Sequence, residues 1–140
     1  MAEAHSFILD ITSDMSNLAR VAEFVADAAR KTKISPRQSD DIQMAVDEAV
    51  TNVMEHAYAG RTNGHISIQL EIDAKAILVE IRDQGRTFNA KKVKKPDVNS
   101  PLSERSIGGL GIFFMKKLMD KVEFTHDESG NITRMFKKLR

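Results

Sequence analysis

The sequence predicts an α+β fold, in which helices and antiparallel strands form the two layers of a sandwich. Three stretches carry apolar residues at helical spacing, and five others place apolar residues at alternate positions. Four of these five follow one another in pairs across short polar links, which is typical of antiparallel hairpins. The order is strand, helix, helix, hairpin, helix, hairpin. Helices and strands are therefore segregated, as a two-layer sandwich requires.

A strand and a helix are predicted first. From residue 7 to residue 11 every second side chain is Phe, Leu or Ile, which predicts a strand. Residues 18–29 carry Leu, Val and Ala at helical spacing, which predicts a helix. Ser13 or Ser16 is the expected N-cap of this helix, because a hydroxyl oxygen can accept a hydrogen bond from a free N–H of the first turn.

The second helix has stronger start signals. Ser35 can cap it, Pro36 suits its first turn, and Gln38 completes a capping-box pattern. Its apolar face continues to about Ala57, where we expect the helix to end. The glycine-bounded residues 60–64 are predicted to form a loop.

The remaining elements are two hairpins and a third helix. Residues 65–72 and 77–82 alternate on either side of a short polar link, which predicts an antiparallel pair with one buried face. Apolar residues at helical spacing predict a helix over 110–119. Residues 122–125 and 132–136 predict a closing hairpin around a polar turn.

Residues 84–108 show no periodicity and contain Pro96 and Pro101. A structureless connection of this length inside a compact domain is either functional or disordered.

Composition narrows the class of protein. With 140 residues, 41% of them hydrophobic and 29% charged, the chain is expected to form one domain over residues 1–140. No apolar run approaches the roughly 20 residues of a membrane span, and no signal peptide is visible. Zero cysteines exclude disulfides and thiolate zinc sites, and a net charge of +1 gives no general attraction to nucleic acid. We therefore expect a cytoplasmic protein without membrane or nucleic-acid contacts.

Glu48 and Asn52 stand one helical turn apart, so both side chains project from the same face of the second helix. A carboxylate and an amide oxygen in this arrangement can serve as a proton acceptor and as a ligand for Mg2+, which takes few protein oxygens. Taken alone, such a pair is more often two solvated helix residues.

Two glycine-containing segments carry groups that can bind a ligand. Asp83 ends a strand beside Gly85, and a carboxylate there can accept a hydrogen bond from an exocyclic amine, although an ordinary Asp-x-Gly turn is the alternative. Gly108, Gly109 and Gly111 precede the third helix, whose free N–H groups and dipole form an anion site. The alternative there is a flexible hinge.

In order and spacing, residues 47–58, 83–88 and 108–111 resemble the N, G1 and G2 boxes of the GHKL (Bergerat-fold) ATP-binding superfamily. Residues 47–58 and 109–113 are similar to the bacterial anti-sigma factor serine-protein kinases. The resemblance covers nearly the whole chain. It implies a Bergerat ATP-binding fold, with helices on one face of a mixed, mostly antiparallel sheet, as a single HATPase-like kinase domain.

The resemblance also implies roles for single residues. Glu48 would be the base that accepts a proton from an attacking serine, and Asn52 would be the protein ligand of Mg2+. Asp83 would bind the adenine amino group, Gly85 would let the base approach the backbone, and Phe88 would be an apolar wall. The other implied contacts are Arg105 at the terminal phosphate, Gly108, Gly109, Leu110 and Gly111 at the phosphates, and Thr133 near adenine.

The leading hypothesis is thus an anti-sigma factor serine-protein kinase that binds ATP and Mg2+, with residues 86–107 as a lid. It would phosphorylate a serine of an anti-anti-sigma (STAS-domain) protein, sequester a sigma factor and form a homodimer. One alternative is a non-kinase module that binds ATP or only protein. Another is the isolated catalytic domain of a sensor histidine kinase, which is disfavoured because no helix pair with a phosphoacceptor histidine is visible. The sequence names neither the sigma factor nor its antagonist.

Overall fold

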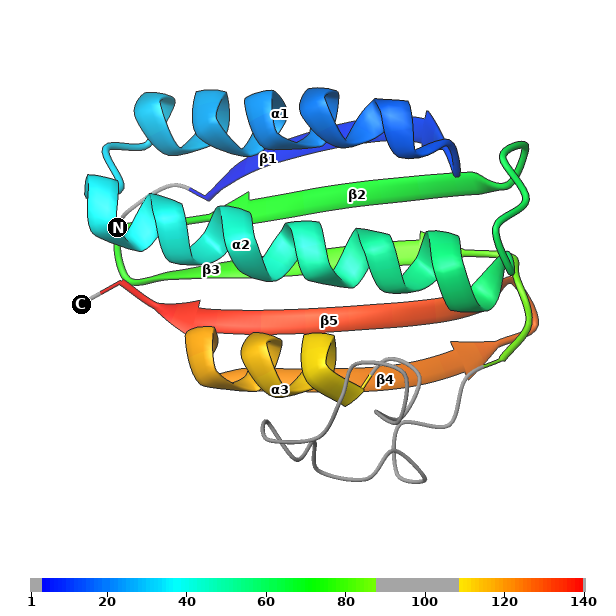
Figure 1. The fold of residues 1–140 in the computed structure, drawn as a ribbon. Helices are drawn as coiled ribbons and strands as arrows, with labels where there is room; N and C mark the ends of the chain where they lie inside the picture. Colours follow the sequence, from blue (N-terminus) through cyan, green and yellow to red (C-terminus); the bar gives the residue numbers. More distant parts are fainter. Residues whose placement is uncertain (1–3, 88–108, 140) are drawn as a thin grey trace.

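The computed structural model of the protein describes residues 4–87 and 109–139. Five strands form one sheet in the order β1-β2-β3-β5-β4, with helices packed against it (Figure 1). The predicted residues Phe88, Arg105 and Gly108, and the predicted lid beyond Thr87, lie outside the described residues. Along the chain the elements are β1 (His5–Thr12), the 3₁₀ turn η1 (Met15–Asn17), α1 (Leu18–Lys31), α2 (Pro36–Asn52), the π-helical turn η2 (Val53–Ala57), β2 (His65–Ile72), β3 (Ala76–Asp83), α3 (Gly109–Leu118), β4 (Lys121–Asp127) and β5 (Gly130–Lys138).

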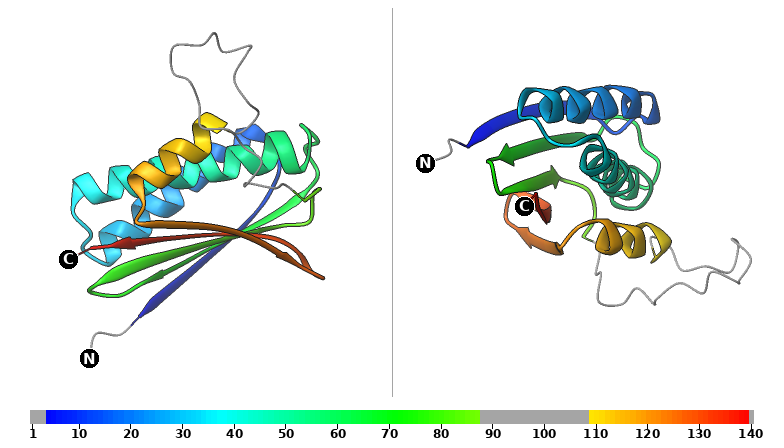
Figure 2. Two further views of the ribbon diagram at one scale, coloured as in Figure 1. Left: turned by 90° about the horizontal axis from the view of Figure 1, so that it is seen from below. Right: turned by 90° about the vertical axis from the view of Figure 1, so that its left-hand side faces the viewer.

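The sheet has a helix-covered face and an open face (Figure 2). On β2, Ile66, Ile68 and Leu70 are fully buried beneath the helices, and the residues between them point to the open face. The predicted two-layer α+β sandwich is thus confirmed. Every pairing between the described strands is antiparallel, where the resemblance implied a mixed, mostly antiparallel sheet. The difference arises because β1 also runs opposite to β2, although two helices separate them in sequence.

The central helix of the helical layer is α2, which lies between α1 and α3 over the middle of the sheet (Figure 1). Its inner face buries Ile42, Ala45, Val46, Ala49 and Val50. Removing a Val or Ile side chain from water contributes about 1.5–3 kcal/mol to folding. This burial fixes the rotation of α2 about its axis, and so fixes which of its polar side chains face α3.

The predicted start of α2 is confirmed. Ser35 is the N-cap, its Oγ accepts a hydrogen bond from the backbone N–H of Gln38 at 3.3 Å, and Pro36 is the first helical residue. The Gln38 side chain also donates to the carbonyl of Leu139 at 3.2 Å. The start of the helix is therefore held to the C-terminal end of the described chain.

The predicted N-cap of α1 is wrong. A 3₁₀ turn precedes the helix, and the Asp14 carboxylate accepts the hydrogen bond from the backbone N–H of Ser16 at 2.9 Å. Ser13 is buried instead, where its hydroxyl accepts a hydrogen bond from the backbone N–H of Gly64 at 2.9 Å. The serine hydroxyls do not cap α1, because the 3₁₀ turn capped by Asp14 separates them from its start and a loop distant in sequence engages Ser13. The N-cap of α1 is Asn17, whose side chain makes no capping hydrogen bond.

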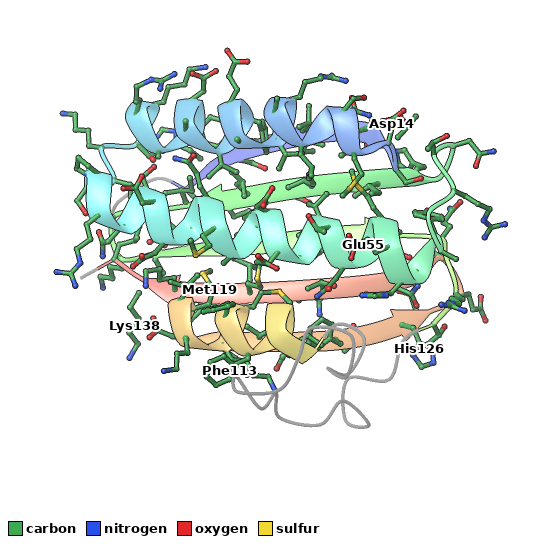
Figure 3. The ribbon with its side chains drawn as sticks, in the orientation of Figure 1. Asp14, Glu55, Phe113, Met119, His126 and Lys138 are labelled. Atoms are coloured by element: carbon green, nitrogen blue, oxygen red, sulfur yellow. The ribbon has the colours of Figure 1, made fainter. Side chains whose placement is uncertain are left out.

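Helix α3 is anchored at its C-terminal end. Lys137 of β5 donates from Nζ to the carbonyl of Leu118 at 2.7 Å, which satisfies an acceptor of the last turn. Met119 is buried, whereas Phe113 lies on the outer side with Lys117 Nζ 5.1 Å from its ring centre (Figure 3).

Within the described part of the chain, no helix combines the length and apolar character that crossing a membrane needs.

Candidate functional site

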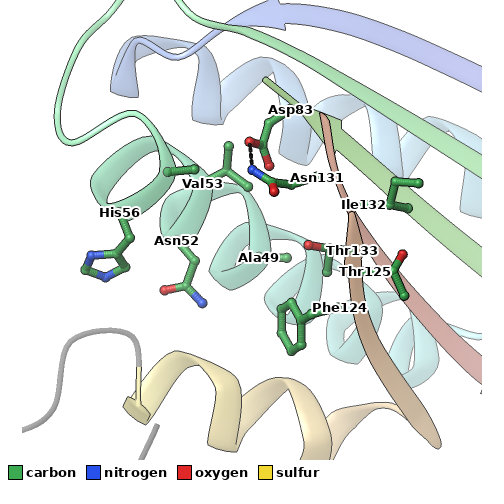
Figure 4. A pocket seen from close by; sticks show the side chains of 11 residues that line it. Ala49, Asn52, Val53, His56, Asp83, Phe124, Thr125, Asn131, Ile132 and Thr133 are labelled. Atoms are coloured by element: carbon green, nitrogen blue, oxygen red, sulfur yellow. Dashed lines mark hydrogen bonds between the residues drawn. The ribbon is translucent and has the colours of Figure 1, made fainter. Parts of the chain in front are cut away.

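A cavity opens between the C-terminal end of α2 and one end of the sheet (Figure 4). It encloses about 470 Å³ of space, counting its open mouth. Its walls are mostly apolar, with a few convergent polar side chains, which is the usual composition of a small-molecule site. The lining residues are Ala49, Asn52, Val53, His56, Ala57, Asp83, Phe124, Thr125, Asn131, Ile132 and Thr133.

Asp83 lies at one end of this cavity, as the last residue of β3 (Figure 4). The residue is only 4% exposed. Its Oδ1 accepts hydrogen bonds from the Asn131 amide at 2.8 Å and from the backbone N–H of Gly85 at 2.9 Å. Burial raises the pKa of Asp83, and these two hydrogen bonds oppose the rise. Both bonds from the described residues end on Oδ1, so Oδ2 remains available to a donor in the cavity.

Gly85 is required by its contact with the π-helical turn. A Cβ on this residue would lie 2.4 Å from the carbonyl oxygen of Ala57, much closer than side chains approach backbone. The next backbone N–H, that of Arg86, donates to the same carbonyl at 2.8 Å. The structure thus gives a second reason for this glycine: the segment after β3 packs directly on the end of α2. The predicted approach of a base remains a prediction.

Tyr58 stabilises the segment after β3 through hydrogen bonds of its hydroxyl group, a role that was not predicted. Its hydroxyl accepts from the backbone N–H of Gln84 at 2.8 Å and donates to the carbonyl of His65 at 2.6 Å. Its ring lies so close to Gly64 that a Cβ there would come within 2.4 Å of it. One buried side chain therefore joins the end of α2 to the end of β3 and the start of β2.

Glu48 and Asn52 lie on the same face of α2, as their spacing predicted, and this face meets the start of α3. A Cβ on Gly111 would lie 3.0 Å from Glu48 Oε2 and 3.3 Å from both Oδ1 and Nδ2 of Asn52. Gly111 therefore leaves the space in which both polar groups sit. Burial, followed by the nearby carboxylates of Asp47 and Glu55, raises the pKa of Glu48 above its usual range.

The Asn52 amide is under-satisfied. Its Nδ2 is buried and has no hydrogen-bond partner among the described residues, which is rare in folded proteins and points to a missing ligand. Turning the amide by 180° would place its oxygen at the same point. In the described ranges, no three or more acidic or histidine side chains are placed so that they could hold a metal ion together. A cation here would take its other oxygens from phosphate and water, as Mg2+ does, so the residues fit Mg2+.

The structure thus gathers most of the predicted residues that it describes. Asp83 and Thr133 line the cavity, and Asn52, which also lines it, stands beside Glu48 and Gly111. Gly109 and Leu110 are the first residues of α3. Asn131 was not predicted, because a residue beside Gly130 in a polar turn carries no signal of its contact with Asp83.

Residues 11–137 match the family described as the histidine kinase-like ATPase domain. Serine-protein kinase RsbW of Listeria monocytogenes is 32% identical over 108 residues, covering 74% of this chain and 69% of the relative. Serine-protein kinase RsbW of Halalkalibacterium halodurans is 41% identical over 106 residues, covering 72% of this chain and 63% of the relative.

Solved structures share the fold at low sequence identity. The crystal structure of the RsbU and RsbW domains of Rv1364c from Mycobacterium tuberculosis matches with a TM-score of 0.70 at 14% identity, covering 96% of this chain and 32% of that chain. The catalytic domain of histidine kinase ThkA matches with a TM-score of 0.55 at 18% identity, covering 98% and 97% of the two chains. The chain therefore belongs to the histidine kinase-like ATPase domain family and, within it, to the RsbW-like anti-sigma factor serine kinases.

Proposed function

We propose that this protein is a serine kinase that transfers the γ-phosphoryl group of ATP to a small anti-anti-sigma (STAS-domain) protein and sequesters a sigma factor. One observation carries the proposal. Two groups of residues lie at the C-terminal end of α2. One is the buried acceptor Asp83, at one end of a cavity, and the other consists of Glu48, Asn52 and the glycine-rich start of α3.

The proposed nucleotide spans these two ends. Its base would lie at Asp83 and Thr133, which line the cavity. Its phosphates would lie toward Gly111, where free N–H groups of a helix start attract anions. Asn52 would hold Mg2+, which neutralises phosphate charge when bound. Phe88 beside the base, and Arg105, Gly108, Gly109 and Leu110 beside the phosphates, remain predicted contacts.

Glu48 is the proposed base of the transfer. The serine oxygen would bond to the γ-phosphorus while the bond between that phosphorus and its bridging oxygen breaks, so that ADP leaves. The serine proton would pass to the Glu48 carboxylate. A carboxylate whose pKa is raised accepts a proton more readily than an ordinary one, which suits Glu48 to this role.

The proposed partners rest on kinship with the RsbW proteins. We infer a cytoplasmic, single-domain homodimer whose first strand and helix make the contact between subunits. Relatives at 32% and 41% identity are named serine-protein kinases, which favours this function over that of a sensor histidine kinase domain, whose likeness here rests on fold alone. The lid over residues 86–107 remains a prediction.

Two variants test the proposal. ATP binding is measured by titration calorimetry with and without Mg2+, and Asp83→Asn should weaken it because an acceptor is replaced by a donor. In a phosphotransfer assay with candidate STAS proteins, Glu48→Gln should abolish transfer but retain ATP binding. Absence of ATP binding at millimolar concentration would refute the proposed nucleotide site. ATP binding without transfer by the unmutated protein to any STAS partner would favour the non-kinase module.

A further inference from the structure

Asn131 has a place at the site that the proposed reaction does not use. It is the second residue of β5 and pairs with Asp83 across the β3–β5 ladder, so both side chains face the cavity. Its Nδ2 lies 2.8 Å from Asp83 Oδ1, 3.1 Å from the carbonyl oxygen of Gly85 and 3.2 Å from that of Arg86. One side-chain amide therefore contacts the carboxylate, as Figure 4 shows, and also the backbone segment that follows it.

These contacts fix which way the Asn131 amide points. Three acceptors surround one end of the group, and only an NH2 group can satisfy them. The bond to Asp83 ends on a carboxylate, which makes it stronger than a bond between neutral groups. Together with the backbone N–H of Gly85, it occupies Oδ1 of Asp83 and leaves Oδ2 toward the cavity.

The backbone around this pair leaves little room for rearrangement. Gly130 has φ +129°, and a Cβ on it would lie 2.1 Å from the carbonyl oxygen of Asp83. On the other side, Gly85 lies against the carbonyl of Ala57. The start of β5 and the end of β3 are therefore in direct contact, and Asn131 holds Asp83 from a fixed point.

We propose that Asn131 is a positioning residue for base recognition: it fixes Asp83 so that Oδ2 is the acceptor that selects a purine with an exocyclic amino group. The inference rests on the proposed ATP function and extends it to the preference for the base. An ionised carboxylate is a stronger acceptor for an amino group than a protonated one, and neither of its oxygens carries a competing proton. The Asn131 hydrogen bond favours the ionised form against the effect of burial. A purine without the amino group offers Oδ2 no such donor.

The test compares two nucleotides that differ only in this group. Dissociation constants are measured for ATP and for purine riboside triphosphate, which lacks the 6-amino group. Their ratio cancels changes in phosphate and Mg2+ binding. The unmutated protein should prefer ATP. Asn131→Ala should lower the preference about tenfold or more, because the amino group would lose its hydrogen bond to the charged Asp83 carboxylate.

Ser129→Ala is the matched control. Ser129 lies in the same turn, but its backbone N–H and hydroxyl donate to Asp127, at 2.8 Å and 2.6 Å. Its loss should weaken the turn without changing the preference for ATP. Thermal melting of each variant separates loss of folding from loss of preference.

Asn131→Asp provides a second readout and nearly preserves shape. At pH 8 it would place two carboxylates together and remove the preference for ATP. Toward pH 5 the pair would share one proton, which restores a hydrogen bond to Oδ1 and with it the preference. The unmutated protein is measured at each pH, because the imidazole of His56, whose pKa is lowered mainly by burial, lines the same cavity. The pKa of the adjoining Tyr58 is raised mainly by burial, so its hydroxyl stays neutral.

An unchanged preference in Asn131→Ala, or in Asn131→Asp at pH 8, would overturn the inference while leaving the ATP site in place. If the unmutated protein bound neither triphosphate, the proposed function and this inference would both be overturned.

Discussion

Replacing Gly111 by alanine should separate catalysis from stability. Gly111 is the third residue of α3, and the added Cβ would lie 3.0 Å from Glu48 Oε2 and 3.3 Å from both terminal atoms of the Asn52 amide. These distances are a few tenths of an ångström shorter than ordinary contacts. Because the two neighbours are ends of flexible side chains, they can turn away, and the backbone need not move.

The expected effects of Gly111→Ala on stability and on the rate of phosphotransfer are opposite. Alanine is about 1 kcal/mol more favourable than glycine inside a helix, so the free energy of unfolding should stay constant or rise by up to that amount. Displacing the proposed catalytic base and the proposed metal ligand by even part of an ångström should lower the rate, since a misplacement of about 1 Å can cost roughly 100-fold. We therefore expect phosphotransfer to fall at least about tenfold in a protein that is no less stable.

The assay is single-turnover phosphotransfer, with urea denaturation measured in parallel. Gly60→Ala is the control, because Gly60 has φ +81° and no neighbour within 4 Å of the added Cβ. It should lose about 1 kcal/mol of stability, since alanine is strained at positive φ, and keep its transfer rate. Unchanged transfer and unchanged Mg-ATP affinity in Gly111→Ala would refute the idea that Glu48 and Asn52 form the phosphate end of the site.

Three further predictions follow from the same geometry. Because the pKa of Glu48 is raised, the rate of phosphotransfer should begin to fall at a higher pH, as the pH is lowered, than it would with a glutamate of ordinary pKa. A pH–rate profile without that shift would contradict the proposed role of Glu48 as the base. The pKa of Asp83 is raised on folding, so ionisation of its carboxyl group lowers the stability of the protein as the pH rises through and above the pKa of the unfolded chain. The Asp83→Asn variant should therefore melt at an equal or higher temperature than the unmutated protein at pH 7. A clearly lower melting temperature would count against this account. Tyr58→Phe should lower the free energy of unfolding by about 1–3 kcal/mol, because it leaves the Gln84 N–H and the His65 carbonyl unpaired; a urea midpoint equal to that of the unmutated protein would disprove it.

Local patterns were enough to predict the three α-helices and the five strands, but not the 3₁₀ turn before α1 or the π-helical turn that ends α2 at Asn52, short of the expected Ala57. Alternation along β2 and helical spacing along α2 reflect burial of one face, which depends only on the period of each element. The Ser35 capping box is equally local, because its partners lie three residues apart. The same is true of Glu48 and Asn52, which share a face because one helical turn separates them.

Contacts between segments that are distant in sequence could not be predicted from local patterns. The expected serine caps of α1 were wrong because Ser13 is engaged by Gly64, about fifty residues away in sequence. Tyr58 was recognised only as part of a motif, since its two hydrogen bonds join β2 to the segment after β3.

The sequence by itself determined which residues are candidates for the chemistry and on which elements they lie. Only the tertiary structure decided that Gly111 lies against Glu48 and that Asn131 holds Asp83. The first contact depends on how α3 packs beside α2, and the second on the register between β3 and β5. Both are set by burial summed over the whole core, which no short stretch of sequence contains.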